Sequence, residues 1–178
     1  ITGLGLGILI SLYRKSSSTV LGLTNFIYTI PSIALFGFLI PFSGIGNTTA
    51  IIALTIYALL PMVHNTYTGI IGIDKEIIEA ARGMGSTTFQ ILYKIQIPLA
   101  FPVILAGIRN MMVMTIALTG IAAFIGAGGL GVAIYRGITT NNSAMTIAGS
   151  LLIALLALLA DWGVGRYEKY IKRKRKLL

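Results

Sequence analysis

Glu79-Ala80-Ala81-Arg82-Gly83-Met84-Gly85 opens the longest polar interruption in this otherwise apolar chain, and Ile95-Gln96-Ile97-Pro98 closes it. Acidic residues at positions 74 and 76 suit the first turn of a helix. The two glycines suit its end, because glycine readily adopts the left-handed conformation of a sharp turn. Thr87 and Gln90 then have the spacing of a capping box. We therefore predict two short helices at an angle over residues 74–98, called the elbow below, with Pro98 starting a new helix.

The composition around the elbow is that of a membrane protein. Of the 178 residues, 56% are hydrophobic and only 11% are charged, whereas roughly a quarter of an average soluble domain is charged. Cysteine is absent, which excludes disulfides and thiolate metal sites. The formal net charge is +9, but the basic residues crowd into the tail 166–178, directly after an apolar run. This placement favours the positive-inside pattern of membrane proteins over a nucleic-acid interface.

Apolar runs predict an all-α membrane protein: a single domain over 1–178, with a polytopic bundle of about five transmembrane helices. The run 1–12 is shorter than the roughly 20 residues of a spanning helix, so we expect the remainder of a helix that is cut off at its N-terminal side. Its Gly3 and Gly7 would let a neighbouring helix approach closely. The segment 16–19 is expected to be a polar turn. Further spans are expected at Val20–Ile40 with Pro31 inside, 48–65 with Pro61 inside, 98–118 and 143–164.

The basic residues also orient the predicted bundle. Arg14 and Lys15, the basic residues of the elbow and the basic tail all fall on one face when the spans are counted, and basic loops mark the cytoplasm. Both the elbow and the C-terminal tail are therefore expected to be cytoplasmic. Considered alone, the elbow could equally be an ordinary loop resting on lipid headgroups.

The spacing of the elbow resembles the EAA loop of binding-protein-dependent ABC importer permeases, the MetI-like family. Glu79-Ala80-Ala81, three residues, Gly85, nine residues and Ile95-x-Ile97-Pro98 follow that pattern, with Ile97 where leucine is usual. The resemblance implies coupling helices that dock on a cytoplasmic ATPase. Glu79 would make a polar contact there, Ala80 and Ala81 would allow close approach, and Gly85 would form the turn. Phe89 would fill the ATPase groove, and Pro98 would close the motif.

The same resemblance implies the partners. They are a pair of ABC ATPase subunits that bind ATP and magnesium, a second permease copy or paralogue, an extracytoplasmic substrate-binding protein and the lipid bilayer of a bacterial cell membrane. No nucleic acid is expected. The chain has no Walker A sequence. We therefore expect a transport subunit that is not an enzyme and holds no cofactor of its own.

Three further stretches resemble the osmoprotectant branch of that family: 29–32, 57–69 and the glycine-rich 126–131. They imply import of glycine betaine, carnitine, choline or related quaternary amines. One alternative is an ABC importer permease for an amino acid such as methionine. Another is a secondary transporter that needs no ATPase, although only Arg109 and Asp161 offer the ionisable residues that such proteins place within their spans.

Several residues inside the spans have two interpretations. Arg109 and Asp161 could form a structural ion pair or line the translocation path. Tyr57 could pack in the core or stack on a quaternary ammonium. His64 is expected to be structural.

Gly126-x-Gly128-x-x-Gly131 matches a dinucleotide fingerprint as a string, but no acidic residue follows about 20 positions later, as that fingerprint requires. We expect an irregular segment near the outer gate.

Overall fold

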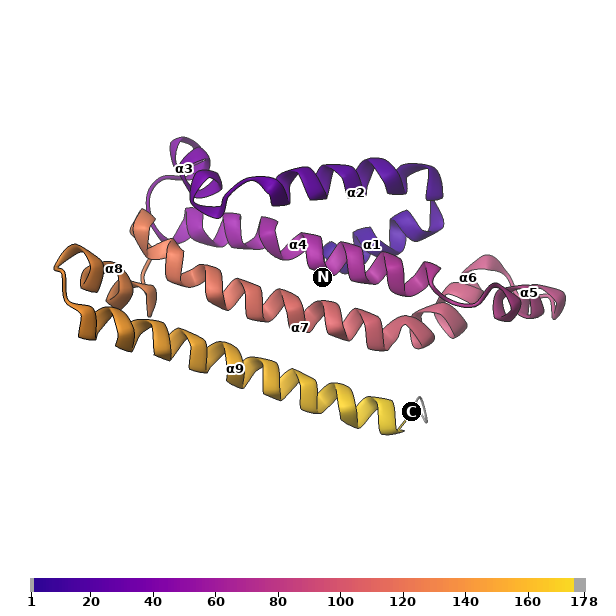
Figure 1. Ribbon diagram of the computed structural model, residues 1–178. Helices are drawn as coiled ribbons and strands as arrows, with labels where there is room; N and C mark the ends of the chain where they lie inside the picture. The colour runs from indigo at the N-terminus through magenta and orange to yellow at the C-terminus, as the bar shows by residue number, and fades with distance from the viewer. Residues whose placement is uncertain (1, 175–178) are drawn as a thin grey trace.

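The computed structural model describes residues 2–174, and this part of the chain is built from helices, with no strand (Figure 1). The expected basic tail 166–178 lies outside the described residues from 175 onward. Three helices are long and apolar enough to cross a membrane: α4 (Asn47–Ile71), a continuous helix over Thr88–Ile125, and the stretch Ser143–Ile171 of α9 (Ser143–Lys174). A bent helix pair is a fourth candidate, and α1 (Thr2–Leu12) is a shorter apolar helix. The helical membrane fold is as predicted.

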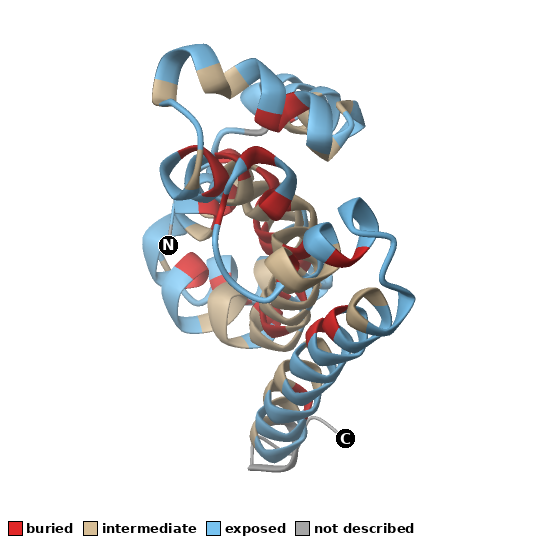
Figure 2. Cartoon of the chain, turned by 90° about the vertical axis from the view of Figure 1, so that its left-hand side faces the viewer, coloured by how far each residue is buried: buried red, intermediate tan, exposed pale blue. Residues whose placement is uncertain are grey.

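Helix α4 and helix α7 (Ile97–Ala122) pack along each other at the centre of the bundle. Helix α2 (Arg14–Thr29) packs on α4, and α9 packs on α7, so the four helices follow one another as α2, α4, α7, α9 (Figure 1). Helix α1 packs against α4 and α2. Figure 2 shows that burial concentrates in the central helices and that most of α9 is exposed.

Glycines allow the central helices to approach closely. A Cβ atom on Gly107 of α7 would lie 2.6 Å from Cβ of Asn65 on α4, which is closer than packed atoms can approach. The predicted role of the α1 glycines is confirmed in the same way. A Cβ atom on Gly3 would lie 2.7 Å from Cβ of Met62, and one on Gly7 would lie 2.5 Å from Cβ of Thr66.

The predicted span Val20–Ile40 is sharply bent at Pro31, where the chain breaks into α2 and α3 (Ser32–Ser43); the two helices meet at 97° and remain a candidate for one broken span. A residue that precedes proline avoids the helical region, and Ile30 is extended, with φ −69° and ψ 125°. The break leaves the Ile30 carbonyl outside the helix, and the hydroxyl of Tyr57 donates a hydrogen bond to it.

The expected polar turn at 16–19 is also wrong, because these residues lie inside α2. The chain reverses between α1 and α2 at Tyr13, whose φ of −104° and ψ of 73° are not helical. Serines are compatible with the first turns of a helix, where backbone N–H groups still lack helical partners.

The glycine-rich segment leaves α7 at the end of the bundle opposite the elbow (Figure 1). A short 3-10 turn, η2 (Ala123–Ile125), is followed by a loop and by α8 (Gly131–Thr139). Gly126 and Gly129 have φ of +77° and +98°, a conformation that side chains disfavour. The amide of Gly128 donates to Oδ1 of Asn47 at 2.8 Å, which ties the loop to the start of α4. This irregular path agrees with the expectation that the segment is not a plain span.

Candidate functional site

The first half of the elbow is helix α5 (Lys75–Gly83), which is closed at both ends by its own residues. Asp74 caps the start, and its carboxylate accepts from the amide of Glu76 at 3.1 Å. At the other end Gly85 has φ +80°, its amide donates to the Arg82 carbonyl at 2.9 Å, and the Ser86 amide donates to the Ala81 carbonyl at 3.0 Å. These paired bonds form a Schellman motif, in which the left-handed position strongly favours glycine.

The second half of the elbow starts with the predicted capping box. Thr87 Oγ1 accepts from the Gln90 amide at 3.3 Å, and Gln90 Oε1 accepts from the Thr87 amide at 2.8 Å. Helix α6 (Thr88–Ile91) then continues through a π-helical turn, η1 (Leu92–Gln96), directly into α7.

The expectation that Pro98 starts a new helix is wrong, because residues 88–125 form one continuous helix of 38 residues. Pro98 lies in the first turn of α7, just after the π-helical turn. Proline lacks the backbone N–H, and at this position the π-helical turn already interrupts the regular α-helical hydrogen-bond pattern. The second half of the elbow is therefore an extension of α7.

The elbow presents a mixed apolar and charged outer surface. Phe89 is 72% exposed and stacks on the exposed Tyr93, with ring centroids 6.4 Å apart. Glu79 and Ala80 are exposed, whereas Ala81 is 1% exposed and faces the interior of the chain. Of the alanine pair in the motif, one side chain is thus available to a partner and the other is used in packing.

The basic residues of the described chain gather toward one end of the bundle. The start of α2, the elbow and the C-terminal part of α9 all lie at the right-hand end in Figure 1. These parts carry Lys15, Lys75, Arg82, Lys94 and Arg166. Arg136 lies in α8 at the other end.

Arg109 on α7 and Asp161 on α9 form an ion pair, which is one of the two interpretations that the sequence allowed. Nε and Nη2 of Arg109 donate to the two carboxylate oxygens of Asp161, each at 2.5 Å. Nη1 of Arg109 also lies 3.8 Å from Oε2 of Glu168. The guanidinium fits against α9 because position 165 is glycine, where a Cβ atom would lie 3.2 Å from Cζ of Arg109.

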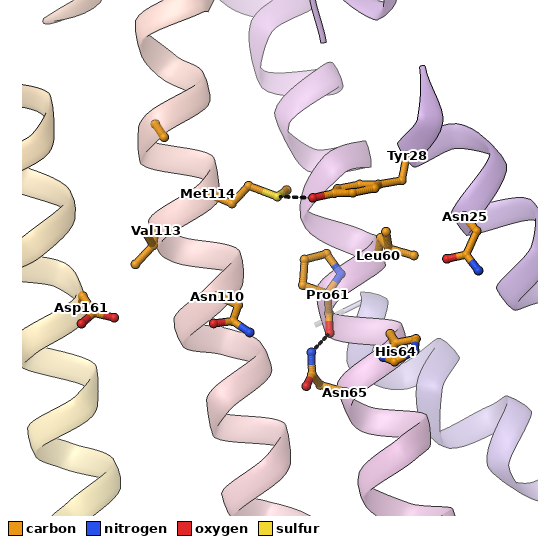
Figure 3. Close-up of a pocket in the computed structure, with 11 residues that line it drawn as sticks. Asn25, Tyr28, Leu60, Pro61, His64, Asn65, Asn110, Val113, Met114 and Asp161 are labelled. Carbon is orange, nitrogen blue, oxygen red and sulfur yellow. Dashed lines mark hydrogen bonds between the residues drawn. The ribbon is translucent and has the colours of Figure 1, made fainter. Parts of the chain in front are cut away.

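A polar groove of about 580 Å³ opens on one face of the α2–α4–α7–α9 layer (Figure 3). We call it the polar groove and define it by its lining residues: Asn25, Tyr28, Leu60, Pro61, His64, Asn65, Asn110, Val113, Met114, Ala117 and Asp161. The hydroxyl of Tyr28 donates to Sδ of Met114 at 3.4 Å and so bridges α2 and α7 across the groove.

A second cavity, of about 510 Å³, lies on the opposite side of the α4–α7 pair and is apolar. Its lining comes from α1, α4 and α7 and includes Leu59, Met62, Met111, Met112 and Ile116. The two faces of the helix pair therefore differ in the polar groups that they present: amides, an imidazole, a phenol and a carboxylate on one, and only threonine hydroxyls on the other. Exposed amides and an imidazole within an apolar bundle are costly in lipid, so the polar groove requires water or another protein surface opposite it.

The structure places the three residues that were predicted for a translocation path in different surroundings. Asp161 lines the polar groove. Arg109 does not line the groove; it lines an adjacent cavity between α7 and α9 together with Asp161, Arg166 and Lys169. Tyr57 is 5% exposed and stands behind the groove, edge-to-face with Tyr28 at 6.1 Å between ring centroids.

Sequence reasoning missed Asn25, Tyr28 and Asn110 as site residues. The spacing of the lining residues along each helix could have indicated the groove. Within each set, successive turns of the helix are three or four residues apart: 25 and 28, then 61, 64 and 65, then 110, 113, 114 and 117. Such spacing places residues on one face of a helix.

Comparison with known proteins gives consistent likenesses over nearly the whole chain. The family model described as "Binding-protein-dependent transport system inner membrane component" matches residues 3–173. The chain is 44% identical over 177 residues to the glycine betaine/carnitine/choline transport system permease protein OpuCD of Bacillus subtilis, covering 99% of this chain and 77% of that one.

Two further comparisons agree. The chain is 45% identical to the osmoprotectant import permease protein OsmW of Salmonella typhimurium, covering 98% of this chain and 83% of that one. An inward-facing structure of the MetNI methionine ABC transporter superposes with a TM-score of 0.86 at 26% identity, covering 95% of this chain and 85% of that one.

Proposed function

Because the chain belongs to the family of binding-protein-dependent transport system inner membrane components, we propose that it is the membrane permease subunit of an ATP-driven importer for quaternary amines such as glycine betaine, carnitine or choline. The relatives that are 44% and 45% identical are named for these substrates or for osmoprotectants. The methionine alternative has the likeness to a methionine transporter in its favour, but at 26% identity. Family membership argues against the secondary transporter.

The observation that carries the proposal is the geometry of the elbow. Two capped helices meet at Gly85, and the second one runs without a break into α7. A partner that moves the elbow therefore moves α7, which contributes four residues to the polar groove. The partner is a pair of cytoplasmic ATPase subunits, which bind ATP and magnesium, because this chain carries no Walker A sequence.

In this proposal the chain crosses the bacterial cell membrane several times, with the elbow and the C-terminal tail in the cytoplasm. Support comes from the basic residues that gather at one end of the bundle, since such residues favour the cytoplasmic side. The chain acts as one domain, and Glu79, Ala80 and Phe89 face the ATPase. Ala81, Gly85 and Pro98 shape the elbow from within.

The polar groove forms one wall of the translocation path in this proposal, and a second permease copy or a paralogue supplies the other wall. Support comes from the contrast between the polar groove and the apolar cavity on the other face of the α4–α7 pair. Asp161 belongs to the wall, Arg109 holds Asp161 in place, and Tyr57 supports Tyr28 from behind. A substrate-binding protein delivers substrate at the end that carries α3 and α8.

The experiment is reconstitution of the permease with its ATPase and binding protein in liposomes. ATP-dependent uptake of labelled glycine betaine, carnitine or choline is expected, with less uptake of methionine and proline. Uptake that needs an ion gradient instead of ATP, with no ATPase co-purifying, would contradict the importer assignment. ATP-dependent uptake of methionine alone would move the assignment to the amino-acid alternative.

A further inference from the structure

The lining of the polar groove has a charge pattern that no comparison assigns. Asp161 is the only Asp, Glu, Lys or Arg among its eleven lining residues, and both oxygens of its carboxylate accept hydrogen bonds from Arg109. The other polar groups are three amides, one imidazole and the phenol of Tyr28 (Figure 3). The basic side chains Arg109, Arg166 and Lys169 line the adjacent cavity between α7 and α9, which shares Asp161 with the polar groove.

Two features of the polar groove suit a soft, bulky cation. Aromatic rings attract ammonium groups at their faces, and Tyr28 is 46% exposed and reaches across the groove from α2 toward α7 (Figure 3). Its hydroxyl is held by a thioether sulfur, which is a weak acceptor, so a passing ligand can displace this contact at little cost.

From this arrangement we propose that the polar groove is a transit site for a quaternary ammonium group, with the ring of Tyr28 as the main contact and the carboxylate of Asp161, paired with Arg109, at the edge of the site. The inference rests on the proposed function and deepens it by naming the side chains and the charge that the path favours. The three amides, Asn25, Asn65 and Asn110, supply donors and acceptors for the remainder of a zwitterionic or hydroxylated substrate.

The chain contains no cysteine, so single cysteines can probe this site without background. Asn110→Cys and Asn25→Cys place a thiol in the polar groove. Tyr170→Cys places one in the basic cavity between α7 and α9, and Met112→Cys places one in the apolar cavity. Each variant is reconstituted with the ATPase and treated with two methanethiosulfonates, one that carries trimethylammonium and one that carries sulfonate.

We expect the cysteines in the polar groove to react faster with the trimethylammonium reagent than with the sulfonate reagent. The ratio of these two labelling rates should be lower at Tyr170→Cys. Comparing rate ratios between positions cancels the intrinsic reactivities of the two reagents. Met112→Cys is expected to react slowly with both. Choline should slow labelling in the groove, whereas its uncharged isostere 3,3-dimethylbutan-1-ol should not. Equal ratios at Asn110→Cys and Tyr170→Cys, or equal protection by the isostere, would overturn the inference.

Transport kinetics provide the second measurement. Tyr28→Phe keeps the ring and removes only the weak contact with Met114, whereas Tyr28→Leu removes the ring. At an exposed site a cation–π contact contributes about 0.5–1 kcal/mol, so we expect Tyr28→Leu to lower kcat/KM for choline about two- to fivefold. Tyr28→Phe should stay near the unaltered protein. Equal losses in both variants would contradict a role for the ring.

The two proposals can fail separately. If ATP drives uptake, but the groove cysteines show no preference and no protection, only the inference fails. If no ATP-dependent uptake occurs in the unaltered protein, the proposed function fails first.

Discussion

Arg109 on α7 and Asp161 on α9 lie side chain to side chain, joined by two N–H···O bonds of 2.5 Å. This bidentate geometry is the strongest form of a protein ion pair. It connects the helix that continues the elbow with the peripheral helix α9, most of whose apolar surface is exposed.

Removing Arg109 should weaken the attachment of α9. In Arg109→Ala the carboxylate of Asp161 keeps its position but loses both donors. Because each side chain is more than a third exposed, solvent screens the pair, and we expect a modest loss of stability, less than for a fully buried pair. Thermal unfolding in detergent measures this loss. The double variant Arg109→Met with Asp161→Leu should recover part of it. A single variant that unfolds at the unaltered temperature and transports normally would exclude both the structural and the path role of Arg109.

The turn of the elbow can be tested with a matched pair of glycines. A Cβ atom on Gly83 or on Gly85 would meet no atom within 4 Å, but only Gly85 has a positive φ, +80°. Gly85→Ala should therefore strain the turn by about 1 kcal/mol and lower ATP-dependent uptake. Gly83→Ala should be neutral or slightly stabilising, because alanine favours a helix. Equal uptake by the two variants would show that the left-handed turn does not matter for transport.

A second pair of glycines tests the packing of α1. Gly7→Ala would place a Cβ atom 2.5 Å from Cβ of Thr66, whereas Gly5→Ala meets nothing within 4 Å. We expect Gly7→Ala to destabilise the protein by about 1–3 kcal/mol, as overpacking does, and Gly5→Ala to have little effect. Melting temperatures of the two variants in one detergent provide the comparison, and matching temperatures would refute this contact between α1 and α4.

Phe89 should matter for binding the ATPase and not for folding. Its side chain is 72% exposed, so Phe89→Ala should leave the unfolding temperature unchanged. An aromatic anchor in a protein interface contributes about 2 kcal/mol or more, so the affinity for the ATPase should fall at least about thirtyfold. Phe42, 77% exposed at the opposite end of the bundle, provides the control. If Phe42→Ala and Phe89→Ala bind the ATPase equally well, the docking role of Phe89 is wrong.

Local rules predicted the elbow well because its geometry depends on neighbours in sequence. The capping box of Thr87 and Gln90 and the left-handed Gly85 both follow from spacing and residue type alone. The same rules failed at Pro98, where a π-helical turn lets the helix pass a proline that usually marks a boundary.

The polar groove was harder to predict because it depends on how whole helices are rotated. Tyr28 and Met114 are 86 residues apart, and no local pattern places them opposite each other. The break before Pro31 was expected as a kink, but the 97° between α2 and α3 depends on what the two helices pack against. Charge alone suggested Arg109 as a path residue, whereas its guanidinium packs closely against Gly165 of α9.

Because α6, η1 and α7 form one unbroken helix, the rotation of the elbow around the helix axis is fixed relative to the polar groove. In an α-helix each residue turns the chain by about 100°. The number of residues between Phe89 and Asn110 therefore sets the angle between the directions in which their side chains leave the helix. Deleting a single residue between 92 and 96 would change the π-helical turn and rotate the elbow around the axis of α7. The length of this segment therefore constrains the protein as strongly as its composition does.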